Sequence, residues 1–137
     1  MEMTFIIAMI ALFIVLFVSL FSLKIRDRIR SKRLSSLKDK LDHYSRYNYY
    51  ELRAEAEKYI SRPHTHYVCR MIGYYSNNKN FRADFNDIFV IDNDIYIYTI
   101  RPGLWIGLHG QTIDDILEYL NTDGDGNKKY DYHIHFI

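Results

Sequence analysis

The chain opens with an uninterrupted apolar stretch. Residues 5–23 contain no charged side chain, and only Ser19 and Ser22 among them are polar. A helix rises about 1.5 Å per residue, so this stretch would span roughly 28 Å, close to the hydrocarbon thickness of a bilayer. A core helix of a globular protein would instead show a polar face. We therefore predict a transmembrane helix over residues 5–23, behind a short N-terminus of residues 1–4.

A cleaved signal peptide is the main alternative for this stretch. Signal peptides begin with basic residues and end at a cleavage site of small residues. Here residues 1–4 contain Glu2 but no Lys or Arg, and no Ala-x-Ala-like site follows. The apolar run is also longer than the hydrophobic region of a usual signal peptide. These features favour a retained anchor.

Apolar residues at three- and four-residue spacing continue beyond the anchor. They are Leu34, Leu37, Leu41 and Tyr44. This spacing predicts that residues 24–47 form a helix. Asn48 suits the N-cap of a second helix, which ends before Pro63. The strands predicted further on are too short to bury a core alone, so at least one helix within residues 34–60 should pack on the sheet.

Residues 62–86 carry mixed signals. Val, Tyr and Cys within residues 65–75 favour a strand, whereas the length of this segment allows a helix. The polar composition of residues 76–80 predicts a turn or loop. The structure of residues 62–86 is left open by the sequence.

A β-hairpin is predicted over residues 87–100. Residues 87–91 and 95–100 are rich in Ile, Val, Phe and Tyr, and the polar residues 92–94 separate them. Pro102 and Gly103 then end the second strand.

Helices and one further strand follow this hairpin. Residues 104–106 resemble the end of a short helix, and residues 111–121 place an apolar stripe on one face of an amphipathic helix. A loop over residues 122–129 leads to a last strand over residues 130–137. The predicted fold class is α+β, with a domain over residues 48–137 whose core lies in residues 85–137.

Charge divides the chain into two parts. Residues 24–40 contain eight Lys or Arg against two Asp, whereas residues 84–137 contain ten Asp or Glu against three Lys or Arg. The basic residues nearest the anchor are Lys24, Arg26, Arg28, Arg30, Lys32 and Arg33. Basic flanks stay on the cytoplasmic side, so the C-terminal domain should be cytoplasmic and residues 1–4 extracytoplasmic. The same side chains can contact anionic lipid headgroups.

The segment from Thr99 to Leu120 carries a distinctive motif. Thr99 is followed by Arg101-Pro102-Gly103, then Leu104-Trp105, then Ile106-Gly107-Leu108-His109-Gly110, and Gln111 opens the amphipathic helix. This run, between a strand and a helix, resembles the KH domain of the second type, as found in a bacterial small-subunit ribosomal protein near the messenger entry site. The resemblance covers residues 85–137.

The resemblance implies a three-stranded sheet packed by helices, with a GxxG turn that holds the backbone of RNA or single-stranded DNA. In that family the turn and the next helix N-terminus bind about four nucleotides. Residues carried over to this role are Arg101, Gly107, Leu108, His109, Gly110 and Gln111.

Two features depart from the family pattern. Leu108 and His109 stand where basic residues are common, and the following helix carries Asp114, Asp115 and Glu118. Affinity for nucleic acid depends on cations that neutralise phosphates, and this acidic region lacks them. A KH-like domain that binds a protein partner or assembles with itself is therefore the first hypothesis, and RNA or single-stranded DNA binding is the second. Trp105 could stack on bases, although core packing is the simpler interpretation.

Other chemistry is weakly indicated. No phosphate-binding loop of the Walker type, nucleophile elbow or dinucleotide fingerprint occurs, so we expect no enzyme and no cofactor. His64 and His66, and likewise His133 and His135, could supply metal ligands if the pairs met, but solvent-facing histidines are favoured and no metal is expected. The single cysteine, Cys69, excludes an intramolecular disulfide and is interpreted as a small core residue.

A third functional hypothesis follows from the anchor. A small membrane protein, such as a phage product, could modulate a membrane machine through its transmembrane helix. The predicted partners are therefore the lipid bilayer, an unidentified protein or a second copy, and RNA or single-stranded DNA as the alternative.

A reporter fused after Ile137 tests the predicted orientation. The basic cluster follows the anchor, so the fusion should give a cytoplasmic signal, for example from a fluorescent protein that does not mature outside the cytoplasm. An alkaline phosphatase fusion at the same position serves as the control and should stay inactive. Phosphatase activity would contradict the orientation.

Overall fold

The computed structural model describes residues 1–137, with side chains described for residues 1–43 and 48–137. Tyr44, a member of the predicted helical stripe, lies outside the described side chains. Contacts along the chain divide it into two compact units, residues 1–39 and residues 40–137. Each unit is described by itself.

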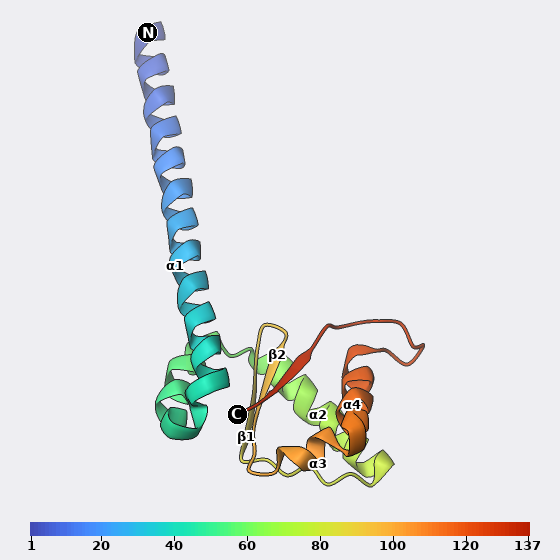
Figure 1. Ribbon diagram of the computed structural model, residues 1–137. Helices are drawn as coiled ribbons and strands as arrows, with labels where there is room; N and C mark the ends of the chain where they lie inside the picture. The colour runs from blue at the N-terminus through green and yellow to red at the C-terminus, as the bar shows by residue number, and fades with distance from the viewer. The chain divides into compact units, whose positions relative to one another are not determined.

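The first unit is helical. It consists of the first part of helix α1, which spans Glu2–Ala56 and so continues into the second unit (Figure 1). Within the second unit, Asn48 interrupts this helix with the non-helical dihedral angles φ −128° and ψ 34°. The large apolar side chains between Phe5 and Leu23 are exposed, and no described residue covers them. This part of the chain is long and apolar enough to cross a membrane. The six basic side chains between Lys24 and Arg33 are exposed on the helix that follows.

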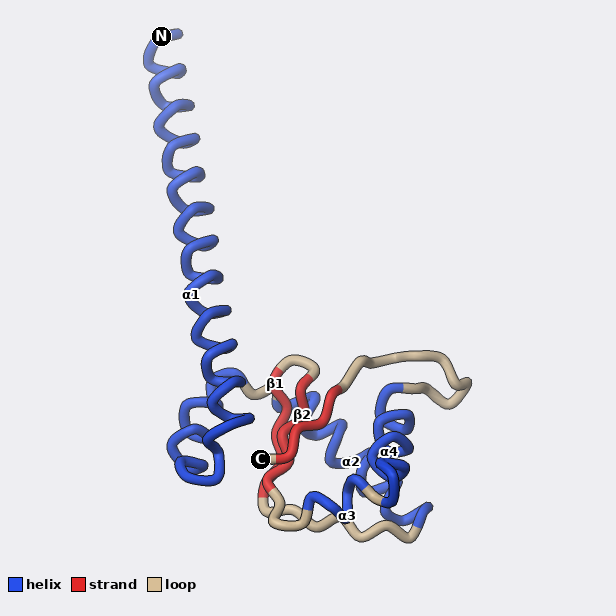
Figure 2. The backbone as a smooth tube through the Cα atoms, in the orientation of Figure 1, coloured by secondary structure: helices blue, strands red, loops and turns tan.

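The second unit contains a three-stranded sheet in the order β1-β2-β3 (Figure 2). Strands β1 (Asp87–Ile91) and β2 (Asp94–Tyr98) form an antiparallel hairpin around a two-residue turn. Strand β3 (His133–Phe136) pairs with β2 in parallel, with Ile95 opposite Ile134. The predicted hairpin and closing strand are thus present.

Two of the strands are shorter than the sequence predicts. Strand β2 ends at Tyr98 because the Thr99 hydroxyl donates to the carbonyl of Asp84, 2.8 Å away, and turns the chain out of the sheet. Strand β3 begins only at His133 because Tyr132 is held by the side-chain amide of Asn121. That amide accepts from the Tyr132 N–H at 2.7 Å and donates to its C=O at 3.2 Å.

One face of the sheet is covered by three helices. They are α2 (Arg62–Lys79), α3 (Pro102–Ile106) and α4 (Gln111–Asn121). The main residues of this core are Val68, Ile72, Ile88, Val90, Ile95, Ile97, Trp105, Ile116 and Leu120. Alternate residues of β1 and β2 belong to it, as expected for strands whose side chains alternate between two faces.

Helix α2 settles the segment that the sequence left open. Ser61 caps its start and Pro63 lies in its first turn, where the missing N–H costs nothing. The prediction of a loop over residues 76–80 is wrong, because the helix runs to Lys79 and ends at Asn80 in a left-handed conformation. Cys69 is exposed on this helix, so its interpretation as a core residue is also wrong.

The second face of the sheet is covered by the last part of α1. Tyr49, Leu52 and Ala56 are buried there. The Tyr49 ring stacks on Tyr98, with ring centroids 3.9 Å apart. This confirms the expectation that a helix within residues 34–60 packs on the sheet.

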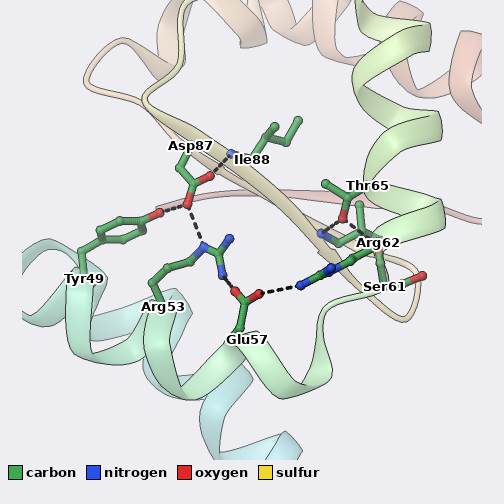
Figure 3. A network of polar contacts seen from close by, with 9 residues as sticks. Tyr49, Arg53, Glu57, Ser61, Arg62, Thr65, Asp87 and Ile88 are labelled. Carbon is green, nitrogen blue, oxygen red and sulfur yellow. Dashed lines mark hydrogen bonds and ion pairs between the residues drawn. The ribbon is translucent and has the colours of Figure 1, made fainter.

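A polar network joins this helix to the sheet (Figure 3). The carboxylate of Asp87 accepts hydrogen bonds from the hydroxyl of Tyr49 and from Nε of Arg53, the latter at 2.8 Å. The Arg53 guanidinium lies 4.9 Å from the ring centroid of Phe89 and also pairs with Glu57. Burial and the bond to Asp87 raise the pKa of Tyr49, so this hydroxyl stays protonated as a donor.

The substitution Asp87→Ala should destabilise the second unit. It removes the acceptor of the bonds from Tyr49, Arg53 and the Ile88 N–H. Bonds to charged groups contribute about 1.5–3 kcal/mol each, but Asp87 is partly exposed and solvent weakens them, so a total loss of about 1–3 kcal/mol is expected. Thermal unfolding followed by near-ultraviolet circular dichroism measures it. Asp125→Ala is the control, because Asp125 is exposed in a loop and should change stability by less than about 0.5 kcal/mol. Equal stability of both variants would contradict the role of Asp87.

Candidate functional site

The motif at Thr99–Trp105 builds a corner of the fold. The carbonyl of Asp84 accepts from the Thr99 hydroxyl and from the indole N–H of Trp105, at 2.8 and 2.9 Å. The backbone N–H of Arg101 donates to the Thr99 hydroxyl at 3.1 Å. Trp105 is fully buried, which supports the core-packing interpretation over stacking on bases. These residues therefore hold α3 against the segment before β1.

The loop after α3 needs its first glycine for two reasons. Gly107 has φ +73°, a conformation that side chains rarely adopt. A Cβ atom added there would also lie 2.1 Å from the Thr112 hydroxyl oxygen. Gly110 has φ +74°, but no atom lies within 4 Å of an added Cβ. The loop is thus pressed against α4 at Gly107 and open at Gly110.

A groove lies beside this loop. It has a volume of about 650 Å³ and runs between the end of α2 and the start of α4. Its lining residues are Tyr75, Lys79, Leu108, Gln111, Thr112, Asp114, Asp115 and Glu118. Two of the predicted site residues, Leu108 and Gln111, therefore reach the groove, whereas Arg101 and His109 do not line it.

The charges of this groove are mainly negative. Lys79 is the single Lys or Arg among its lining residues, and three carboxylates face it. One of these has a structural partner, because the Tyr75 hydroxyl donates to Asp115 at 2.8 Å. Burial and this bond raise the pKa of Tyr75 to about 12. The groove therefore favours a cationic ligand over phosphate.

Arg101, another predicted site residue, contacts Asp84 instead of the groove. Its side chain is exposed and lies 3.9 Å from a carboxylate oxygen of Asp84. Tyr75 and Lys79 were missed as groove residues because the structure of α2 was left open, although Val68, Ile72 and Tyr75 already follow helical spacing.

Several large apolar side chains on α3 and on the segments beside it are exposed. We call them the α3 surface: Phe85, Ile100, Leu104, Ile106 and Leu108. Ile100 and Leu108 are each 77% exposed, and Leu104 is 48% exposed. Phe85 is included because its ring lies 6.2 Å from that of Trp105, centroid to centroid. Groups of exposed large apolar residues mark interaction sites more often than isolated ones do.

The histidines serve separate contacts. His64 Nδ1 lies 2.5 Å from the hydroxyl of Tyr132, whereas His135 lies between Asp42 and Asp94, 3.2 and 2.9 Å away. Within residues 1–43 and 48–137, no group of three or more His, Cys, Asp or Glu is placed to hold a metal ion.

Comparison of the chain with protein-family models, with curated proteins and with solved structures finds no significant match. The functional argument therefore depends on the geometry of the chain itself.

Two alanine substitutions test the construction of the loop. Gly110→Ala should cost about 1–2 kcal/mol, the usual cost of a left-handed conformation for a residue with a Cβ. Gly107→Ala should cost clearly more, because Thr112 must also move. Chemical denaturation of the two variants measures the difference. Equal losses would contradict the close approach of Gly107 to α4.

Proposed function

We propose that this chain is a membrane-anchored adaptor whose C-terminal α+β domain binds a protein partner through the α3 surface. The observation that carries this proposal is that Ile100, Leu104 and Leu108 are exposed, although the domain has a buried apolar core of its own. Water contact with such side chains is unfavourable, and a partner that covers them gains their burial, about 25 cal/mol per Å² of apolar surface.

The anchor is supported by α1. The apolar side chains of residues 5–23 are exposed all around the helix, so a bilayer is the environment that fits them. The basic side chains after the anchor suit a cytoplasmic membrane surface. This placement would hold the domain close to the membrane and restrict its partners to those found there.

A KH-like identity of the domain is part of the proposal. Its support is the order of elements, in which a hairpin, a short helix, a glycine loop, an amphipathic helix and a strand follow one another as the motif implied. The run from Arg101 to Gly110 occupies the loop and short helix of that order. This domain would keep the backbone of such a fold and use a different surface for binding.

Charge is the reason for preferring a protein partner. A nucleic-acid backbone beside Gly107–Gly110 would meet Asp114 and Glu118 on α4, both of them exposed. One Lys or Arg, Lys79, lines the groove beside this loop, and Arg101 pairs with Asp84. Electrostatic attraction is the main source of affinity that does not depend on sequence, and repulsion would replace it here.

Nucleic-acid binding is the second candidate because one observation favours it. Gly110 is open, and α4 begins directly after it at Gln111. A helix N-terminus of this kind presents backbone N–H groups that suit an anion. This geometry would allow a phosphate group to approach the N-terminus of α4 beside Gly110.

Site-specific photocrosslinking in cells tests the adaptor proposal. A photoreactive amino acid at Leu108 or Ile100 should give an adduct with a discrete protein, whereas the same group at Tyr50 should not give that adduct. Tyr50 is 84% exposed and lies on α1, away from the α3 surface in sequence. Leu104→Asp should reduce the Leu108 adduct at unchanged protein level. Adducts of equal yield and identity at all three positions would contradict the proposal.

Titration of the full-length protein with labelled RNA and single-stranded DNA separates the two candidates. At low salt, where attraction between charges is strongest, we expect no binding tighter than about 100 µM, the weak end of non-specific affinities. Micromolar binding that is lost in Gly110→Asp would overturn this expectation and support the second candidate. Gly124→Asp, which adds the same charge in the loop after α4 where an added Cβ meets no atom within 4 Å, is the matched control.

A further inference from the structure

The two edges of the sheet differ in whether their outward backbone groups have hydrogen-bond partners. On the outer edge of β1, the C=O of Val90 accepts from the N–H of Ser61 at 2.9 Å, and its N–H donates to the Thr65 hydroxyl at 3.1 Å. The Ile88 N–H donates to the side chain of Asp87. This edge is therefore covered by hydrogen bonds from α2 and from the strand itself.

The outer edge of β3 has no such cover. The N–H groups of His133 and Ile137 donate to Asn93 and Ile97, on the β2 side. Because backbone groups alternate along a strand, those of Ile134 and Phe136 point to the opposite, outer side. Within residues 1–43 and 48–137, no hydrogen bond to these outer groups occurs apart from the sheet itself. The strand also carries no Lys, Pro or bulge that would discourage pairing.

We propose that β3 is a self-association site, at which two copies of this chain pair antiparallel through their β3 edges. A two-fold axis at His135 places Ile134 of one copy opposite Phe136 of the other, and the reverse. All four outward N–H groups and all four outward C=O groups of the two copies then find partners, which gives four hydrogen bonds. The interface is isologous and closes as a dimer.

The side chains fit this register. Ile134 and Phe136 lie on the face that packs against the core, and both are half-buried. Across the axis they form two apolar cross-strand pairs, which are favourable in antiparallel sheets. Each His135 lies opposite its copy, and Asp42 and Asp94 contact each ring.

An alternative register is disfavoured by the strand's own contacts. An axis at Ile134 would require the N–H of Tyr132, which already donates to Asn121. The Tyr132 side chain is also buried. A second copy paired in the first register thus satisfies the outward N–H and C=O groups of both Ile134 and Phe136. This pairing uses no residue of the α3 surface.

Disulfide cross-linking of the full-length protein in liposomes tests this register. In a Cys69→Ser background, His135→Cys should cross-link to a dimer, because a directly opposed pair has its Cα atoms about 4.5 Å apart, within the range of a disulfide. His133→Cys is the matched control on the same strand and face. Its two copies would lie four residues apart along the strand, roughly 13 Å, and should not cross-link.

Ile134→Pro provides the second measurement, because His135→Cys also removes the contacts with Asp42 and Asp94. The Ile134 N–H points outward, so proline there removes no bond of the fold but blocks pairing. If its melting temperature is unchanged, the Ile134→Pro variant should form a dimer whose Kd is at least about tenfold higher than that of the original chain. Ile134→Val is its control. Equal cross-linking of both cysteine variants, absence of cross-linking in both, or a dimer that withstands Ile134→Pro would overturn the proposal.

Discussion

The second unit depends on covering both faces of a very small sheet. Its strands contain four or five residues each, and such a sheet is not stable when one apolar face meets water. Helices α2, α3 and α4 bury one face, and the end of α1 buries the other. Since the end of α1 supplies the second cover, this part of the helix is also part of the domain core. Folding of the domain is therefore tied to the segment that follows the apolar residues 5–23.

This constraint also decides what is left for binding. With both sheet faces buried, the three binding places considered above are the α3 surface, the groove beside α4 and the edge of β3. The three places differ in chemistry, since the first is apolar, the second mainly acidic and the third built from backbone groups. Leu108 belongs to both the α3 surface and the groove, so ligands of these two places would compete, whereas the β3 edge shares no residue with either.

Much of the fold could be predicted from local patterns. The amphipathic spacing in residues 111–121 predicts helix α4 with the bounds it has in the structure, and the polar residues 92–94 between two β-rich runs predict the hairpin. Strand ends were less predictable because they depend on single distant contacts, such as Thr99 with Asp84 and Tyr132 with Asn121. The sequence left helix α2 open because Val, Tyr and Cys favour strands, whereas in the fold the burial of Val68, Ile72 and Tyr75 on one helix face outweighs that preference. Of the candidate site, the loop residues could be named in advance, whereas the groove needed Tyr75 and Lys79 from a distant segment.

Asn121 has a consequence for how this domain can change over evolution. Its side-chain amide pairs with both backbone groups of Tyr132 in the manner of a neighbouring strand, across a gap of 11 residues. The start of β3 is thereby fixed by the end of α4 and not by the length of the loop between them. The length of the loop over residues 122–129 therefore does not determine the register of β3 in the sheet. Insertions and deletions in that loop should be tolerated more readily than a single change at Asn121, which makes the loop the natural place for new sequence to enter.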